Sequence, residues 1–99
     1  MSANLPTRVT EDAITSRIVA VEYIRIGATV TICNISLDSG FSVRGESACV
    51  DPANYNEALG QKYAYEQAFE KLWPLFGFAL SEQRFAAGLV RGVEGGVGG

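Results

Sequence analysis

The residues that could carry chemistry lie in the run Glu46-Ser47-Ala48-Cys49-Val50-Asp51, where a hydroxyl and a thiol stand between two carboxylates. A serine or cysteine nucleophile needs a neighbouring group that takes its proton or favours its ionised form. Glu46 and Asp51 offer negative charge, which disfavours a thiolate. Asp51 precedes a proline and is better suited to capping a helix than to acid–base work with Glu46.

The chain contains no histidine, which removes the commonest general base and the commonest nitrogen ligand for zinc. Cys33 and Cys49 are expected to be free thiols in a reducing cytosol, with a disulfide as the alternative. The sequence therefore predicts a protein that is not an enzyme and that holds no metal or cofactor.

The strand-to-helix joint at residues 45–54 suits an anion better than a nucleophile, because a helix start offers free backbone N–H groups. No GxxxxGK[ST] or GxGxxG pattern occurs. Arg25 and Arg44 are predicted to share one sheet face, and an arginine can hold a phosphate through paired hydrogen bonds. Solvated surface charge is the alternative for both. Arg84 is a further phosphate candidate.

Aromatic residues are dense after the joint, and most are expected in the core, although a few could stack on a nucleobase. Tyr65 and Phe76 are the candidates for stacking. Ser47 and Asn54 are candidates to line a pocket at the joint. The predicted ligand-binding residues are thus Arg25, Arg44, Ser47, Asn54, Tyr65, Phe76 and Arg84.

Length and charge limit the class of protein. With 99 residues, 47% of them apolar, the chain is expected to form one globular domain. Its net charge of −3 argues against binding a long nucleic acid, which draws its affinity from clustered basic residues. No apolar run reaches the roughly twenty residues of a membrane span, and no signal peptide is expected at the N-terminus.

The expected fold class is α+β, with a three-stranded antiparallel meander followed by a long helix and a shorter C-terminal helix. Residues 17–26, 29–37 and 41–50 are predicted strands, because they are rich in β-branched residues and separated by turn signals. The turns set the expected register, with Ile26 opposite Thr29 and Leu37 opposite Phe41.

This register assigns the two faces of the sheet. The predicted core face carries Ile18, Ala20, Ile24, Ile26, Cys33, Ile35, Leu37, Phe41 and Val43. The predicted outer face carries Val19, Val21, Tyr23, Arg25, Val30, Ile32, Asn34, Arg44 and Glu46. The outer face is more apolar than a solvated sheet face usually is, which indicates either a partner surface or a cover formed by the C-terminal segment.

The first helix is expected to begin near Asn54, with Asn54 and Glu57 as a capping box. Pro74 predicts a kink or break at Leu72-Trp73, and a second helix is expected from Phe78 to Ala87. The domain is thus expected to span residues 17–87, between a flexible N-terminal segment at 1–16 and a disordered glycine-rich tail at 88–99.

The segment TVTICNISLDSGFSVRGESACVDPANYNEALG, with QKYAYEQAFEKLWPLFGF after it, resembles a family of small proteins encoded by tailed phages. The pattern is a threonine-rich strand and N-G-F, then G-x-S-A-C-V-D-P-x-N-aromatic, then a glycine, then A-x-x-x-A-x-x-K-x-W, and it covers about half the chain. The matching positions are Gly40-Phe41, Gly45, Ser47 to Pro52, Asn54-Tyr55, Gly60, Ala64, Ala68, Lys71 and Trp73.

That phage family is similar to the Thoeris anti-defence (Tad) sponge proteins, which bind and hide cyclic ADP-ribose signals or cyclic oligonucleotides made by bacterial immune enzymes. The resemblance implies a homo-oligomer, such as a dimer or hexamer, with ligand pockets where protomers meet and no chemistry on the ligand. It also implies a location in the cytoplasm of the infected host. The alternative is a protein-interaction module that binds a host protein through the outer sheet face.

Overall fold

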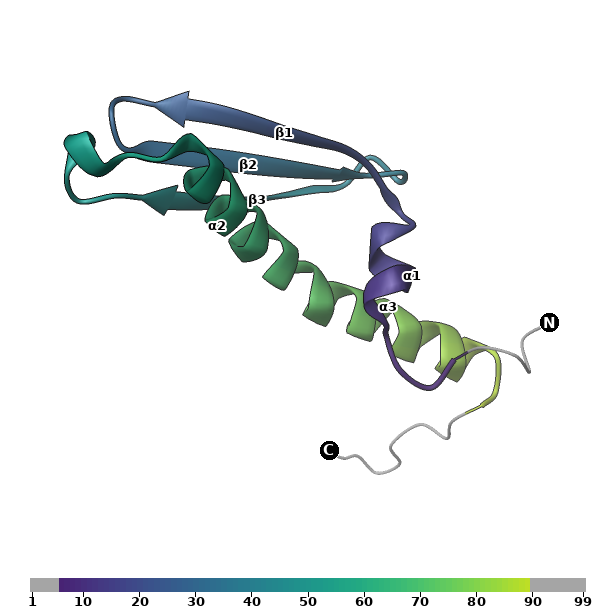
Figure 1. The fold of residues 1–99 in the computed structure, drawn as a ribbon. Helices are drawn as coiled ribbons and strands as arrows, with labels where there is room; N and C mark the ends of the chain where they lie inside the picture. Colours follow the sequence, from purple (N-terminus) through teal and green to yellow (C-terminus); the bar gives the residue numbers. More distant parts are fainter. Residues whose placement is uncertain (1–5, 90–99) are drawn as a thin grey trace.

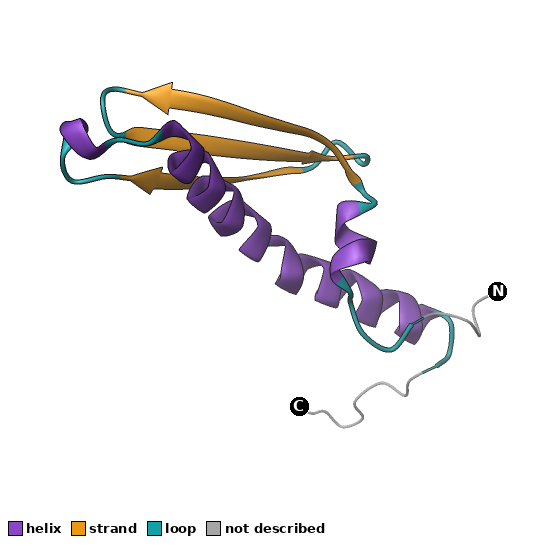
Figure 2. Ribbon diagram, in the orientation of Figure 1, coloured by secondary structure: helices purple, strands orange, loops and turns teal. Residues whose placement is uncertain are grey.

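The computed structural model describes residues 6–89, so most of the predicted tail at residues 88–99 lies outside the described part. The expected α+β architecture is confirmed: an antiparallel sheet in the order β1-β2-β3 precedes a long helix that is bent into two pieces (Figures 1 and 2). The elements are α1 (Glu11–Thr15), β1 (Ile18–Ile26), β2 (Val30–Leu37), β3 (Ser42–Ala48), η2 (Pro52–Asn54), α2 (Glu57–Glu70) and α3 (Leu72–Ala86).

The N-terminal segment 1–16, expected to be flexible, contains the short helix α1. The Thr10 hydroxyl caps this helix by accepting a hydrogen bond from the Ala13 N–H at 3.1 Å. Ile14 is fully buried in the main core cluster. A helix of this length is not stable alone, so the packing of Ile14 must stabilise it. The local sequence does not indicate this packing.

The β2–β3 register agrees with the prediction, since the Leu37 N–H donates to the Phe41 carbonyl at 2.8 Å. The predicted β1–β2 register is wrong by one residue, because Ile26 lies opposite Val30 and not Thr29. The connecting loop has an extra residue, and Gly27 adopts a left-handed conformation with φ 64° at its start. A shift of one residue moves every β1 side chain to the other face of the sheet.

The face assignments therefore hold for β2 and β3 but not for most of β1. Val21, Tyr23 and Arg25 project toward the side that α2 covers, whereas Ile24 and Ile26 lie on the open side. A β-bulge between Ile18 and Ala20 changes the register once more at the start of the strand. Ile18 packs against the core as predicted, but Ala20 does not.

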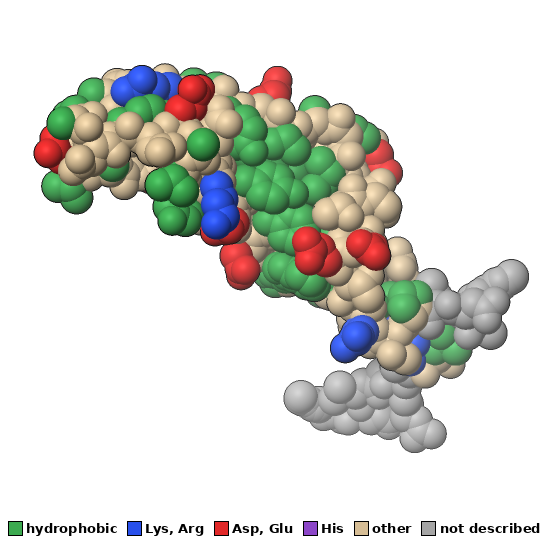
Figure 3. Space-filling model, in the orientation of Figure 1, with side chains coloured by type: hydrophobic (Ala, Val, Ile, Leu, Met, Phe, Trp, Pro, Cys, Tyr) green, Lys and Arg blue, Asp and Glu red, His purple; other side chains and the backbone are tan. Residues whose placement is uncertain are grey.

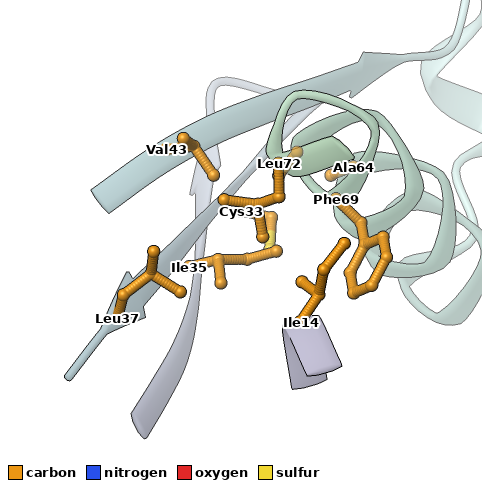
Figure 4. Close-up of a cluster of buried hydrophobic side chains, with 9 residues drawn as sticks. Ile14, Cys33, Ile35, Leu37, Val43, Ala64, Phe69 and Leu72 are labelled. Atoms are coloured by element: carbon orange, nitrogen blue, oxygen red, sulfur yellow. The ribbon is translucent and has the colours of Figure 1, made fainter. Parts of the chain in front are cut away.

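Helix α2 packs against β2 and β3 at very short range, because the contact is made by residues with little or no side chain. A Cβ atom added to Gly45 would collide with the Ala64 carbonyl and the Ala68 N–H of α2. One added to Gly60 would lie 2.7 Å from the Thr31 hydroxyl. The core around this contact consists of Ile14, Cys33, Ile35, Leu37, Val43, Ala64, Ala68, Phe69 and Leu72 (Figure 4).

The helical region breaks between Glu70 and Leu72, close to the predicted position. Pro74 is the third residue of α3, where a helix makes no use of the backbone N–H. The proline therefore fits into the first turn, and the second helix begins at Leu72 and not at Phe78.

The joint between β3 and α2 contains two successive caps. Asp51 caps the short helix η2 by accepting a hydrogen bond from the Ala53 N–H at 3.0 Å, as expected for an aspartate before a proline. The predicted capping box of Asn54 and Glu57 is wrong, because Asn56 caps α2 by accepting from the Leu59 N–H at 3.1 Å. The extra turn of η2 displaces the start of the main helix along the chain.

Candidate functional site

The residues predicted to bind a ligand do not converge on one place within a single chain. Arg25 and Asn54 lie at the end of the sheet near the β3–α2 joint, and Arg44 lies on the opposite sheet face. Tyr65 borders a groove between β1 and α2, while Phe76 and Arg84 lie on α3. The strongest site is the one at the joint.

Two contacts hold Arg25 in position there. Its guanidinium carbon lies 3.8 Å from the centre of the Tyr55 ring, and its Nη2 donates to the Ala28 carbonyl at 2.8 Å. The Tyr55 hydroxyl is in turn 3.0 Å from that of Thr31. No carboxylate within residues 6–89 forms an ion pair with Arg25. An oriented guanidinium without a carboxylate partner is suited to bind a phosphate.

A hollow of about 160 Å³ lies beside Tyr55. It is lined by Thr29, Ala48, Cys49, Asn54, Tyr55, Asn56, Leu59, Gly60 and Tyr63. Lys62 lines a separate hollow between β1 and α2, but its Nζ lies 5.7 Å from the centre of the Tyr63 ring and so brings a second cation to the edge of this one. We call Arg25, Asn54, Tyr55, Lys62 and Tyr63 the joint site. It combines positive charge with aromatic faces, which is the combination that a nucleotide needs.

Sequence reasoning selected Arg25 and Asn54 but missed the other members of the joint site. The density of aromatic residues was a signal for Tyr55 and Tyr63, but it did not distinguish them from the core aromatics. Lys62 follows the four-residue spacing of a solvated helix face. The turn formed by η2 places Tyr55 next to Arg25, and the local sequence does not indicate that contact.

Ser47 ties β3 to α2. Its hydroxyl donates to the Gly60 carbonyl at 2.7 Å, and this bond is partly buried. We predict that Ser47→Ala lowers the free energy of unfolding by about 1 kcal/mol, because the carbonyl loses its donor. Urea denaturation measures the change. Ser39→Ala, at an exposed turn, is the control and should cost less than about 0.5 kcal/mol. Equal losses in both variants would contradict this role for Ser47.

Arg44 and Arg84 are engaged elsewhere. Arg44 lies on the open face of the sheet, where its Nη1 donates to the Asn34 side chain at 3.1 Å. The prediction that it shares a face with Arg25 is wrong, because the β1 register differs by one residue. Arg84, near the end of α3, donates to the Pro6 carbonyl at 3.1 Å. Phe76 packs against the core, with the Arg17 guanidinium 5.8 Å from its ring centre.

Tyr65 borders a hollow of about 340 Å³ that we call the β1–α2 groove. Hydrophobic side chains gather in this region, with charged side chains around them (Figure 3). The groove is lined by Glu11, Tyr23, Lys62, Tyr65, Glu66, Phe69 and Glu70. Burial raises the pKa of Tyr65 and of Tyr23, so both phenols stay neutral at physiological pH. The acidic rim makes this groove a poorer phosphate site than the joint.

Cys33 is buried below the groove, and burial raises the pKa of its thiol. It therefore stays neutral at physiological pH, and a neutral thiol is a weak nucleophile and metal ligand. Within residues 6–89, no group of His, Cys, Asp and Glu side chains is arranged to hold a metal ion. In the same part of the chain, no helix is both long and apolar enough to cross a membrane.

These features define a small α+β domain whose sheet is covered on one side by a bent helix. The chain belongs to the phage protein (N4 Gp49/phage Sf6 gene 66) family, whose family model matches residues 9–84. This confirms the resemblance to a small phage protein family. Comparisons with curated proteins and with solved structures gave no significant match.

Proposed function

We propose that this protein is a phage counter-defence sponge, which binds a cyclic nucleotide immune signal and hides it without cleaving it. The observation that carries the proposal is Arg25, which is stacked on Tyr55 beside a hollow and has no carboxylate partner among the described residues. Membership of a phage protein family is consistent with a role during infection of a bacterial host.

The joint site offers a group for each part of such a ligand. Arg25 and Lys62 would neutralise phosphates, and the rings of Tyr55 and Tyr63 offer faces for a base. Asn54 can donate to or accept from the edge of a base. The bound ligand would be cyclic ADP-ribose, one of its isomers or a cyclic oligonucleotide. These are the ligands of the Thoeris anti-defence (Tad) proteins, to which we propose that this chain is related.

The hollow at the joint is small for a whole ligand. Its volume of about 160 Å³ is below the roughly 300–1,000 Å³ of ordinary small-molecule pockets. We therefore propose that the protein works as a homo-oligomer, a dimer or hexamer, in which a second copy completes the pocket. The proposed place of action is the cytoplasm of the infected bacterial host.

Binding without chemistry agrees with the side chains at the joint site. The chain has no histidine, and the hydroxyl of Ser47 is bonded to a helix carbonyl. Sequestration needs tight binding alone, and a group that activates water or attacks the ligand is not required for it.

A heat-release assay tests this function. Purified protein is incubated with cyclic ADP-ribose, its isomers and cyclic dinucleotides, separated from free ligand and then heated. The expected result is recovery of one intact ligand by mass spectrometry. The same ligand should raise the melting temperature by several degrees, because it binds only the folded state. Recovery of a cleaved product would instead identify an enzyme.

A protein-interaction module is the second candidate, because one sheet face is uncovered. Among the described elements, no helix covers the face opposite α2 (Figure 1). Ile24 and Ile26 are 56% and 51% exposed there, next to Val30 and Ile32. No thermal shift with any cyclic nucleotide, together with capture of a host protein that Ile24→Lys abolishes, would favour this second candidate.

A further inference from the structure

The two edges of the sheet differ in whether their backbone groups are covered, and α2 closes the β3 edge. Leu37 of β2 and Thr29, directly before β2, bond to the β3 side, so the alternate β3 residues turn their backbone groups outward. Lys71 donates to the outward carbonyl of Arg44 at 2.6 Å, and Gln67 accepts from the outward N–H of Glu46 at 2.7 Å. This edge has no room for another strand.

The β1 edge is open. Because the odd-numbered residues of β2 bond to β3, its even-numbered residues bond to β1, and their partners there are the even-numbered residues from Ala20 to Ile26. The N–H and C=O groups of Val21, Tyr23 and Arg25 therefore point outward. Within residues 6–89, no group is hydrogen-bonded to them. Figure 1 shows β1 at the rim of the sheet, away from α2.

β1 has few of the features that usually protect an exposed edge, and its charged side chains are those of Glu22 and Arg25. It contains no lysine or proline, and its single bulge lies at the start, between Ile18 and Ala20. Both faces carry exposed apolar side chains, with Tyr23 39% exposed on the α2 side and Ile24 56% exposed on the open side. A long, regular and apolar edge of this kind is a site for pairing with another strand.

We infer that the β1 edge pairs antiparallel with the β1 edge of a second copy of this chain, centred on Tyr23. Tyr23 is the middle residue of the bulge-free stretch from Ala20 to Ile26, and the outward backbone groups of Val21 and Arg25 lie two residues to either side of it. An antiparallel pair of identical strands has a two-fold axis, so this centre pairs every residue of the stretch.

Charge favours the same register. Centring on Tyr23 places Glu22 opposite Ile24 of the second copy and Val21 opposite Arg25, so no like charges meet. Centring on Glu22 would place this carboxylate opposite itself, which is unfavourable. A second copy is the inferred partner because it brings the same open β1 edge, so one contact satisfies both edges, and the β3 edge closed by α2 leaves no place for a further strand.

The paired sheets would be continuous, with both α2 helices on the same face. Each β1–α2 groove is open on its β1 side in one chain, and the partner strand would extend its floor through a second Val21 and Tyr23. This inference specifies the contact in the homo-oligomer and rests on that part of the proposed function. It does not depend on any ligand.

Amide hydrogen exchange of the wild-type protein, read by NMR together with its mass in solution, tests the pairing. In an unpaired chain the amides of Val21, Tyr23 and Arg25 exchange rapidly, while those of Glu22 and Ile24 are protected by β2. In the paired form, all of them should exchange more than about a hundredfold slower than in an unstructured peptide. Dilution should restore rapid exchange at the odd-numbered positions only.

Tyr23→Pro removes one outward N–H without breaking a bond to β2. Edge strands accept proline at positions whose N–H faces outward. We expect this variant to have the mass of a smaller species by light scattering, while Tyr23→Val, which keeps the N–H, retains the wild-type mass. If the proline variant does not fold, the exchange experiment decides alone. A monomeric wild type, or an oligomer with rapidly exchanging Val21, Tyr23 and Arg25, would overturn the inference. Loss of ligand binding with slow exchange would overturn only the sponge function.

Discussion

Gly45→Ala is expected to lower the free energy of unfolding by about 3 kcal/mol, the upper part of the usual range for overpacking. The added methyl group would meet the Ala64 carbonyl and the Ala68 N–H, and it would lie 2.9 Å from the Ala68 Cα. These are backbone atoms, so no side chain can rotate to make room. The helix must move off the sheet, which opens the core around Cys33 and Ile35.

Urea denaturation measures this loss, and Gly77→Ala is the matched control. Gly77 lies within α3, has no atom within 4 Å of an added Cβ, and does not adopt a positive φ. Its replacement should therefore stabilise the protein by about 0.4–1 kcal/mol, because alanine restricts the unfolded chain. If Gly45→Ala unfolded at the wild-type urea concentration, α2 would not contact β3 as closely as described.

This contact explains much of the pattern of small residues in the sequence. Gly45, Gly60, Ala64 and Ala68 are the positions where α2 and the sheet approach at backbone distance. Ser47 bonds across the same contact to the Gly60 carbonyl. The pattern therefore reports helix–sheet packing at these positions, and a nucleophile is not needed to account for it.

The fold could be predicted where local signals determine it. Asp38-Ser39-Gly40 specifies the β2–β3 turn, and Pro74 marks the helix break to within a residue or two. The turn at Gly27 is ambiguous, because a loop of either length can use a glycine at its start. The error of one residue there reversed the faces of β1. Helix α1 depends on Ile14 reaching a distant core, which a local pattern does not reveal.

The candidate site was predictable only in part. Arg25 was predicted together with Arg44, because the two were expected to share a sheet face, but Arg44 lies on the opposite face. Its actual neighbour, Tyr55, lies 30 residues after Arg25 in the chain. The contact exists because β1 and the joint meet at the same end of the sheet, and spacing in the sequence does not encode that meeting.

Arg25→Ala is expected to weaken binding of the cyclic nucleotide found by the heat-release assay by about ten- to a hundredfold. A charge-assisted hydrogen bond to phosphate contributes on the order of 1.5–3 kcal/mol, and about 1.4 kcal/mol corresponds to a tenfold change in Kd. The guanidinium lies at the surface, stacked on Tyr55, so its removal should leave the core unchanged. Calorimetric titration gives Kd, and circular dichroism checks the fold.

Arg44→Ala is the matched control, because it removes the same charge from the opposite face of the sheet. Its binding loss should be below about 1 kcal/mol, which is the effect of a solvated charge. Arg25→Lys should lie between the two, since lysine keeps the charge but lacks the planar group that stacks and bonds in pairs. Equal weakening by Arg25→Ala and Arg44→Ala would show that general surface charge attracts the ligand. Wild-type affinity in Arg25→Ala would remove the joint site from the mechanism.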